Sequence, residues 1–310
     1  EVLMLARICT AIVSGVTLST VMTFINDIIP QEQAPRIISF VYAGFSVASV
    51  LGTPIGTLLS DAFGIKSAFV AVEAVALLVT VLLLISVPRS GSTDVSSSVR
   101  EQLVILKDRR IILVLVMKAF GMAATYVFYV YVTPILEDSV GLSVWMVSLV
   151  LFFYGGATIV SNLGSGSLAQ RYGLGKLPLM FALQAVVLVL LGVSLASGNT
   201  VLCIINVVLT GVFIYHMNAP LQSYLLQVSA KDYPRALTLA SAVMPTSSDI
   251  GIATGSFMGG VVATNLGFAW SGPVGAVLAV VSVVAAFMIL QPESRMGGSL
   301  RSRLRKNRKQ

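Results

Sequence analysis

The sequence predicts an all-α integral membrane protein. Of its 310 residues, 56% are hydrophobic and only 11% are charged, whereas a soluble domain carries about 25% charged residues. A soluble chain of this size cannot bury so much apolar surface, so its solvent must be lipid. Two further observations support this fold class. The apolar residues fall into nine long stretches, and a loop followed by a helix recurs 199 positions along the chain.

Each of the nine stretches is long enough to cross a bilayer, because a spanning helix needs about 20 mostly apolar residues. They lie at roughly 2–24, 38–60, 67–87, 111–134, 142–163, 178–196, 201–225, 238–262 and 270–290. The loops between them are short except for a polar segment rich in Ser and basic residues. We therefore predict four parts: a bundle remainder at 1–87, a cytoplasmic linker at 88–110, a six-helix bundle at 111–291 and a basic tail at 292–310.

The lysines and arginines predict how the chain is oriented, because cytoplasmic loops of membrane proteins are enriched in them. If the basic tail is cytoplasmic, alternating spans place 17 of the 20 Lys and Arg residues on that side. Lys66 is then outside, and Arg7 and Lys118 lie within spans. The sequence thus predicts a multi-pass protein with a cytoplasmic C-terminus. Its tail is also expected to attract anionic lipid.

The repeat joins a basic loop to a long apolar helix with a G-x-x-x-G step. Its two copies contain Pro35, Arg36, Gly52 and Gly56 in the first, and Pro234, Arg235, Gly251 and Gly255 in the second. Many membrane transporters are built from such repeated units. If the second half begins near residue 111, its counterpart begins upstream of residue 1. We therefore expect three further spans before this segment and twelve in the intact protein.

Several function classes are not supported by the composition. The net charge of +7 does not indicate nucleic-acid binding, because the basic residues lie in loops and in one tail. Cys9 and Cys203 lie inside apolar stretches and the chain has one histidine, so neither a metal site nor a disulfide framework is predicted. No cluster of acid, histidine and nucleophile marks an enzyme. We expect a monomer in the lipid bilayer, without cofactor or metal.

Three motifs occur in a characteristic order. They are Arg7, Ala11 and Gly15 at four-residue steps, then Gly52, Pro54 and Gly56, then the loop 166–176 with the sequence GSLAQRYGLGK. Together they resemble the major facilitator superfamily over the whole chain, specifically its bacterial twelve-span drug and sugar efflux branch of proton antiporters, which includes arabinose-efflux permeases. The loop of that branch usually reads G-x-L-A-D-R-x-G-R-K, and Gln170 here replaces the acid.

The resemblance implies the major facilitator fold, two six-helix bundles of which this chain carries spans four to twelve. It also implies a secondary active transporter in the bacterial inner membrane, exporting a small solute such as a sugar, nucleoside or drug in exchange for protons. Alternating access of one site to the two sides is the implied mechanism. An uptake facilitator or proton symporter of the same fold remains open, as does a membrane-embedded enzyme or lipid-handling protein.

Two charged residues are candidates for proton coupling. A charge at the bilayer centre costs roughly 2.5–3.5 kcal/mol on insertion scales, so such residues usually have a function. Asp249 lies deep in its span, and its repeat equivalent is Val50, so symmetric scaffolding does not require the acid. Arg7 matches an arginine that the family uses in coupling. The alternatives are that Asp249 only hydrogen-bonds as the neutral acid and that Arg7 extends to the membrane surface.

A polar and aromatic stripe on the span at 111–134 is a candidate substrate surface. Lys118, Tyr126, Tyr129 and Thr133 share one helical face, and the resemblance implies that this helix lines the central cavity. The polar face of the span at 201–225 adds Asn206 and Thr210. The alternatives are that Lys118 extends to the cytoplasmic surface and that the tyrosines only pack.

Small residues at four-residue steps are candidates for helix packing and gating. They are Gly52, Pro54 and Gly56 in one repeat copy and Gly251, Gly255 and Gly259 in the other. Small residues let helix backbones approach closely in lipid, and such smooth surfaces also let two halves rock against each other. The resemblance further implies a cytoplasmic charge network that holds one conformation, with Asp27, Arg36 and Arg171 as its members here. The alternative for Asp27 is a plain acid at a helix end.

Overall fold

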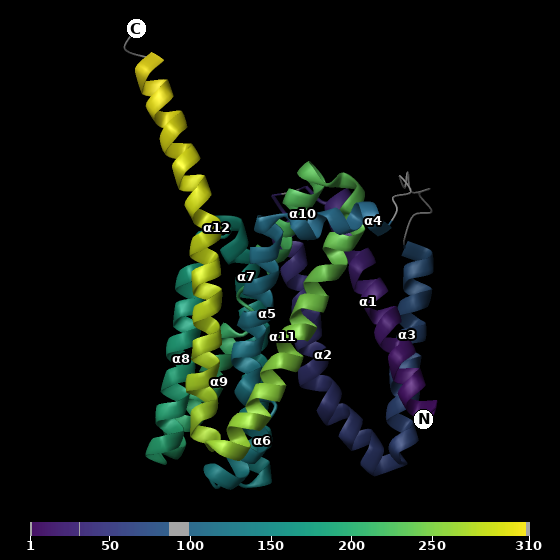
Figure 1. Ribbon diagram of the computed structural model, residues 1–310. Coiled ribbons are helices and arrows are strands. Elements are labelled where there is room, and N and C mark those ends of the chain that lie inside the picture. The colour runs from purple at the N-terminus through teal and green to yellow at the C-terminus, as the bar shows by residue number, and fades with distance from the viewer. Residues whose placement is uncertain (1, 31, 87–98, 308–310) are drawn as a thin grey trace.

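The computed structural model describes residues 2–30, 32–86 and 99–307, and every regular element in these ranges is helical (Figure 1). The long helices are α1 (Val2–Ile28), α2 (Ala34–Phe63), α3 (Ile65–Ser86), α5 (Arg109–Tyr129), α7 (Val144–Tyr172), α8 (Leu177–Ser197), α9 (Thr200–Phe213), α10 (Asn218–Asp232), α11 (Leu237–Asn265) and α12 (Ser271–Asn307). Short helical segments lie between them: α4 (Val99–Gln102), η1 (Leu103–Lys107), α6 (Val132–Pro134), η2 (Ile135–Ser139), η3 (Pro234–Ala236) and η4 (Phe268–Trp270).

The nine predicted spans all correspond to helices. In the described ranges, seven segments are long and apolar enough to cross a membrane by length and composition. The other two predicted spans are α1, which contains the shorter apolar segment Val13–Ile25, and α11, in which Pro245, Asp249 and several Ser and Thr residues dilute the apolar character. The predicted division at 88–110 stays a prediction, because 87–98 lie outside the described ranges.

The predicted basic tail continues the last span as helix. Helix α12 runs without interruption to Asn307 and extends beyond the other helices (Figure 1). The side chains of 292–310 lie outside the described ones, so the roles predicted for them stay predictions.

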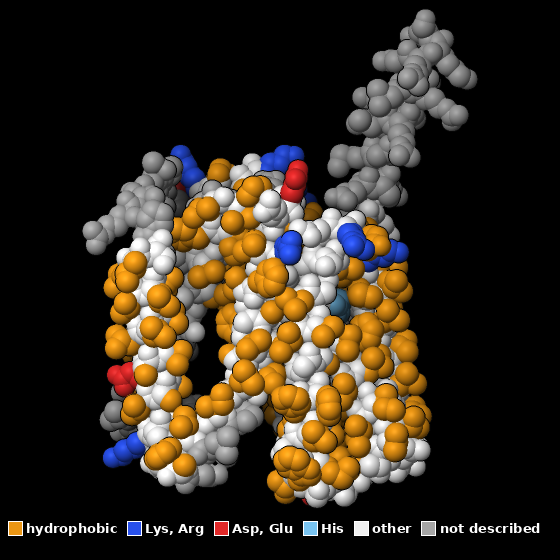
Figure 2. All heavy atoms as spheres, turned by 180° about the vertical axis from the view of Figure 1, so that it is seen from behind, with side chains coloured by type: hydrophobic (Ala, Val, Ile, Leu, Met, Phe, Trp, Pro, Cys, Tyr) orange, Lys and Arg blue, Asp and Glu red, His pale blue; other side chains and the backbone are white. Residues whose placement is uncertain are grey.

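The helices form two groups that meet near one end. Helices α1, α2 and α3 lie on one side and the group from α5 to α12 on the other, with α2 packed along α7 and α1 against α11 (Figure 1). Seen from behind, apolar side chains cover the molecule over its length, and a hollow lies between the side that contains α3 and the rest of the molecule (Figure 2). Most of the Lys and Arg side chains visible in that view gather where the groups meet.

Glycines allow the two groups to approach closely. A side chain at Gly155 of α7 would collide with Val50 of α2, and one at Gly166 would collide with Ser39. Thr23 of α1 and Ser241 of α11 have hydroxyl oxygens 3.1 Å apart, in hydrogen-bond contact. Because lipid provides little hydrophobic drive between helices, such close packing and polar contacts supply the association.

The same principle holds within the larger group. Three glycines of α11 lie one turn apart and each faces the backbone of α5: Gly251, Gly255 and Gly259 meet Ala119, Ala123 and Val127. In addition, the hydroxyl of Ser247 donates to the carbonyl of Leu115 at 2.6 Å. By contrast, a Cβ at Gly52 or Gly56 of α2 would have no described atom within 4 Å. The gating role predicted for these two glycines stays a prediction.

The predicted span at 201–225 is not one helix, which corrects the sequence interpretation. Helix α9 ends at Phe213 and α10 begins at Asn218, with a non-helical turn at 214–217. Pro220 lies in the first turn of α10, where a proline fits because the backbone N–H groups of a first turn have no partner within the helix. Helix α1, the repeat equivalent of α9 and α10, is unbroken.

Two hydroxyls of α7 compensate for the break. The backbone N–H of Tyr215 donates to Ser161 Oγ at 3.0 Å, and that of Ala219 donates to Ser165 Oγ at 3.4 Å. Non-helical backbone inside a membrane is tolerated only where other protein groups satisfy it. Helix α7 therefore supports the turn that carries Tyr215 and positions Asn218.

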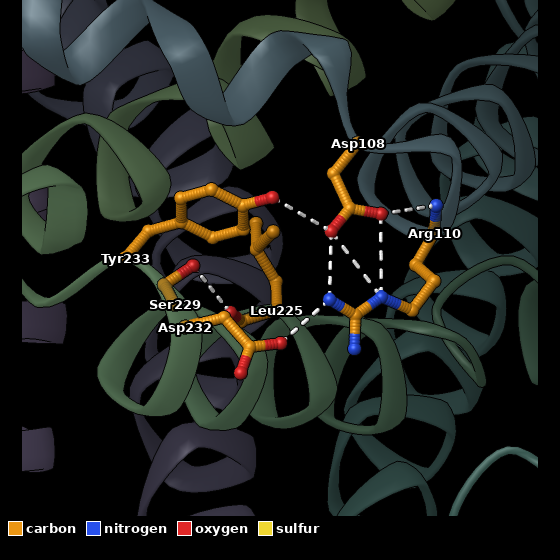
Figure 3. Close-up of polar contacts among 6 residues, drawn as sticks. All are labelled: Asp108, Arg110, Leu225, Ser229, Asp232 and Tyr233. Atoms are coloured by element: carbon orange, nitrogen blue, oxygen red, sulfur yellow. Dashed lines mark hydrogen bonds and ion pairs between the residues drawn. The ribbon is translucent and has the colours of Figure 1, made fainter.

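A polar cluster ties the start of α5 to the end of α10 (Figure 3). Asp108 caps α5 by accepting from the backbone N–H of Arg110 at 2.8 Å. The Arg110 guanidinium bonds to Asp108 at 2.7 Å and to Asp232 at 2.6 Å, and the Tyr233 hydroxyl donates to Asp108 at 3.1 Å. Hydrogen bonds from Arg110 hold the pKa of Asp108 below its ordinary value, and the bond to Asp108 raises the pKa of Tyr233.

Replacing Gly255 by alanine should weaken the α5–α11 contact. Alanine normally stabilises a helix by about 0.5–1 kcal/mol relative to glycine, but a Cβ here would lie 2.8 Å from the Cα of Ala123. Overpacking of this kind costs about 1–3 kcal/mol. We expect Gly255→Ala to lower the melting temperature in detergent and Gly156→Ala, which meets open space, to leave it equal or higher. Equal melting of both variants would contradict the assigned contact.

The Asp108 cluster should make stability depend on acidity. An acid whose pKa is lowered by folding stabilises the protein above its unfolded value, about 3.9, and this stabilisation is lost as the pH falls below it. Asn is also a good helix cap, so Asp108→Asn keeps the cap and removes the charge. We expect the wild type to have a higher melting temperature than Asp108→Asn between pH 5 and 7. This difference in melting temperature should shrink as the pH falls from 4 to 3. Melting curves that stay parallel throughout would exclude this contribution.

Candidate functional site

A cavity of about 150 Å³ lies between the two helix groups. Both groups contribute to its wall: Leu18 of α1, Tyr42 and Phe45 of α2, Lys118 and Met122 of α5, Asn162 of α7, Tyr215 of the turn, Asn218 of α10, and Pro245, Ser248 and Asp249 of α11. The repeat-related helices α2 and α11 both contribute to this wall. Lys118 and Asp249 lie near the middle of their helices, so two opposite charges occur at depth in the same cavity.

Lys118 begins a chain of hydrogen bonds that crosses from one helix group to the other. Its ammonium, in a side chain only 2% exposed, donates to Asn218 Oδ1. Asn218 Nδ2 donates to Asn162 Oδ1 at 2.7 Å, and Asn162 Nδ2 donates to Ser46 Oγ at 2.8 Å and to the Tyr42 carbonyl at 3.2 Å. The bonds therefore connect α5 through α10 and α7 to α2.

Tyr42 contacts this chain a second time. The Lys118 ammonium lies over its ring, 5.5 Å from the centroid, a geometry in which the ring face attracts a cation. The Tyr42 hydroxyl donates to Gln222 Oε1 of α10 at 3.3 Å. A buried charge needs partners of this kind, because an unpaired one is costly in a low-dielectric interior. Lys118 thus does not extend to the membrane surface; its ammonium stays inside the bundle.

Asp249 differs from Lys118 in its surroundings. Its side chain is exposed on the cavity wall, and among the described residues it has no hydrogen bond or ion pair. Lys118 and Tyr126 are the titratable groups with which its charge interacts. Val50, its repeat equivalent, packs against Gly155 of α7. At this position, one copy of the repeat therefore carries a packing residue and the other carries an acid on the cavity wall.

The residues of the predicted substrate stripe do not all lie at the cavity. Lys118 lines the cavity, and Tyr126 lies close to Tyr215, which also lines it. Tyr129 stacks on Tyr154 of α7 with centroids 4.8 Å apart and lies behind this wall. Thr133 is exposed in α6, beyond the end of α5. The tyrosines thus form an aromatic layer next to the cavity, and Thr133 is separate from it.

The other predicted positions lie away from the cavity or outside the described side chains. Asn206 donates to Ser194 of α8, and Thr210 donates to the Val207 carbonyl at 2.7 Å. Arg36 lies over the Phe40 ring at 5.8 Å, and no described ion pair includes Arg36 or Arg171. The side chains left undescribed are those of Arg7, Asp27 and Pro54.

The residues that sequence reasoning missed are Tyr42, Asn162, Tyr215 and Asn218. Asn162 and Asn218 carried a usable signal, because amides inside apolar spans are costly unless they are bonded. Their partnership depends on the register of α7 against α10, which no local pattern reveals. In the described part of the chain, no group of three or more His, Cys, Asp and Glu residues is placed to hold a metal.

The family model of the Major Facilitator Superfamily matches residues 1–244. The chain belongs to the major facilitator superfamily. Superfamily relatives include MFS-type transporter YtbD of Bacillus subtilis (strain 168), 30% identical over 284 residues, covering 91% of this chain and 71% of YtbD. Another is inner membrane transport protein YdhP of Escherichia coli (strain K12), 25% identical over 295 residues, covering 94% of this chain and 74% of YdhP.

The fold of the superfamily is also found among solved structures. A bacterial homologue of the iron transporter ferroportin, in an outward-facing state, superposes with a TM-score of 0.63 at 15% identity. The match covers 86% of this chain and 66% of that one. The chain is therefore a multi-pass membrane protein of the major facilitator fold, and its activity is transport.

The hydrogen-bond chain predicts that Asn162 and Asn218 are energetically coupled. Residues in one bonded network show interaction energies of about 0.5–3 kcal/mol, because removing one partner leaves the other unsatisfied. We expect Asn162→Ala with Asn218→Ala to destabilise the transporter by less than the two single variants added together. Unfolding free energies in mixed detergent would measure this. Asn162→Ala with Asn265→Ala is the control, because Asn265 is exposed and its described hydrogen bonds go to nearby residues of α11. The destabilisation by this pair should equal the sum of the two single effects. Additivity of both pairs would refute the network.

Proposed function

We propose that this transporter exports a small solute in exchange for protons by alternating access, in the bacterial inner membrane with its C-terminus in the cytoplasm. The observation that carries the proposal is the Asp249 carboxylate. It faces the cavity between the groups without a described hydrogen-bond partner, and the buried Lys118 lines the same cavity. The distribution of Lys and Arg supports the orientation, and the relatives' membrane context supports the location.

Exchange requires that solute and proton occupy one site alternately. In the proposed cycle, the ionised Asp249 accepts a hydrogen bond or a positive group from the solute, and its protonation removes that contact and releases the solute. The superfamily resemblance adds Arg7 as the residue that tunes coupling. Lys118 keeps the ionised carboxylate compatible with a low-dielectric cavity, because an opposite charge nearby favours the ionised form.

Movement between the two open states would be a rocking of the α1–α3 group against the larger group. Its contact surface is α2 against α7 and α1 against α11, where glycines and hydroxyls provide shallow packing. Gly52, Pro54 and Gly56 lie on α2 beyond this contact, and we assign them to the surface that closes in the opposite state. In the same way we assign Asp27, Arg36 and Arg171 to a cytoplasmic charge network that helps to hold one state.

A proton symporter is the second candidate, and the pair of charges supports it. When Asp249 is protonated, the Lys118 charge has no opposite charge on the described cavity wall. An anionic solute then gains from binding together with a proton, which yields symport instead of exchange. The direction of proton movement during solute flux separates the two candidates.

Asp249→Asn should separate transport from proton coupling. Asparagine resembles the protonated acid and cannot release a proton, so we expect no solute-dependent proton flux in liposomes. Solute exchange in counter-flow assays with sugars, nucleosides and drugs should persist, because it needs no change of protonation. Glu73→Gln is the matched control, since it removes an exposed acid of α3 away from the cavity, and it should retain coupling. Unchanged proton flux in Asp249→Asn would refute the role of Asp249, and solute flux along with the proton would favour symport.

A further inference from the structure

The cavity wall carries one cation and one anion, on neighbouring helices. Among its described lining residues, Lys118 and Asp249 are the only charged ones, so its formal charge is zero when both are ionised. Helices α5 and α11 pack through the glycine contacts of α11, so the two charges are held at a fixed spacing. The rest of the wall consists of aromatic and aliphatic side chains, two amides and a serine hydroxyl.

The Lys118 ammonium is held in one orientation, but not all of its N–H donors have a described hydrogen-bond partner. It has three N–H donors, and its described hydrogen bond is the one to Asn218. Asn218 cannot rotate away without breaking its bond to Asn162, and the Tyr42 ring covers another side of the ammonium. These contacts fix the ammonium beside the cavity that Lys118 lines, and its other donors have no described hydrogen-bond partner. A carboxylate or another small oxyanion is the natural acceptor.

The Asp249 carboxylate has the complementary property. An ionised carboxylate offers about four acceptor sites, and no described hydrogen bond uses them. An ammonium group of a ligand would satisfy it. A ligand with only a positive group would meet the repulsion of Lys118, and one with only a negative group would meet that of Asp249. A ligand that carries both a negative and a positive group is attracted by Lys118 and by Asp249.

We propose that the cavity binds a small zwitterion, such as an α-amino acid or a close derivative. Its anionic group is bound by Lys118 and its cationic group by Asp249. The aromatic side chains of Tyr42, Phe45 and Tyr215 then contact the uncharged part of the ligand. This inference rests on the proposed function, since it identifies the solute of the same cavity.

A set of probes that share a side chain and differ in the charge of their amino and carboxyl ends tests the inference. For each of alanine, leucine and phenylalanine, the free amino acid is a zwitterion, its amide is a cation, its N-acetyl derivative is an anion and its N-acetyl amide is neutral. At pH 6.5 the α-amino groups are protonated. We expect at least one free amino acid to raise the melting temperature of the purified protein. Each of its three derivatives should need an at least tenfold higher concentration to raise the melting temperature by the same amount. Failure of all three free amino acids, or equal potency of a neutral derivative, would overturn the proposal.

Two variants should change the preference in opposite directions. Asp249→Asn removes the group that binds the cation, so the N-acetyl acid should become the best probe. Lys118→Gln removes the group that binds the anion, so the amide should become the best. If Lys118→Gln fails to fold, Asp249→Asn still decides the question, because its side chain is exposed and has no described partner. Glu73→Gln should rank the probes in the same order of potency as the wild type. Loss of the preference for the zwitterion in this control would count against the assigned site.

The outcomes distinguish this inference from the proposed function. If free amino acids bind and exchange but move no protons, the zwitterion site stands and proton coupling fails. If sugars or nucleosides are transported with proton movement and no zwitterion binds, coupling stands and the zwitterion site is refuted.

Discussion

The buried ammonium of Lys118 is the constraint on which the central part of this molecule depends. A charge at this depth is tolerated only when hydrogen-bond partners and opposite charge replace the water it has lost. Its immediate partners come from α10 and α2, in Asn218 and Tyr42, and Asn162 of α7 holds Asn218 in place. The position of Lys118 therefore links four helices from both groups. The wall of the cavity and the contact between the groups are parts of one arrangement.

The broken helix follows from the same constraint. The chain is non-helical at 214–217, just before the helical turn that contains Pro220, and the hydroxyls of Ser161 and Ser165 satisfy the backbone that this break releases. In consequence, α10 begins at Asn218, beside the ammonium. Small residues then allow the close packing that keeps this geometry, because Gly155, Gly166 and the glycines of α11 bring backbones near one another where larger residues would collide. The polar network and the glycine contacts thus support each other.

Much of the fold was predictable because it depends on local patterns. Apolar length predicted the spans, and the charge of Lys118 in an apolar helix predicted a residue of the cavity. Asn206 shows the limit. Its cavity role was inferred from the polar face that it shares with Thr210, but the packing of α9 against α8 brings Asn206 to Ser194 instead. Asn162 and Asn218 were missed for a related reason. Their pairing depends on the register of helices distant in sequence, which single-chain periodicity does not contain.

The repeat shows how one architecture acquired two different halves. Helices α2 and α11 are related by the shift of 199 positions, and both line the cavity. At corresponding positions, Val50 packs against α7, whereas Asp249 faces the cavity. Likewise α1 is continuous, and its equivalent is divided into α9 and α10. The departures from symmetry thus lie at the acid and at the helix break, the two features that bring charged and amide groups into the cavity. Symmetry accounts for the scaffold of this transporter, and its loss marks the positions at which the solute and the proton are expected to bind.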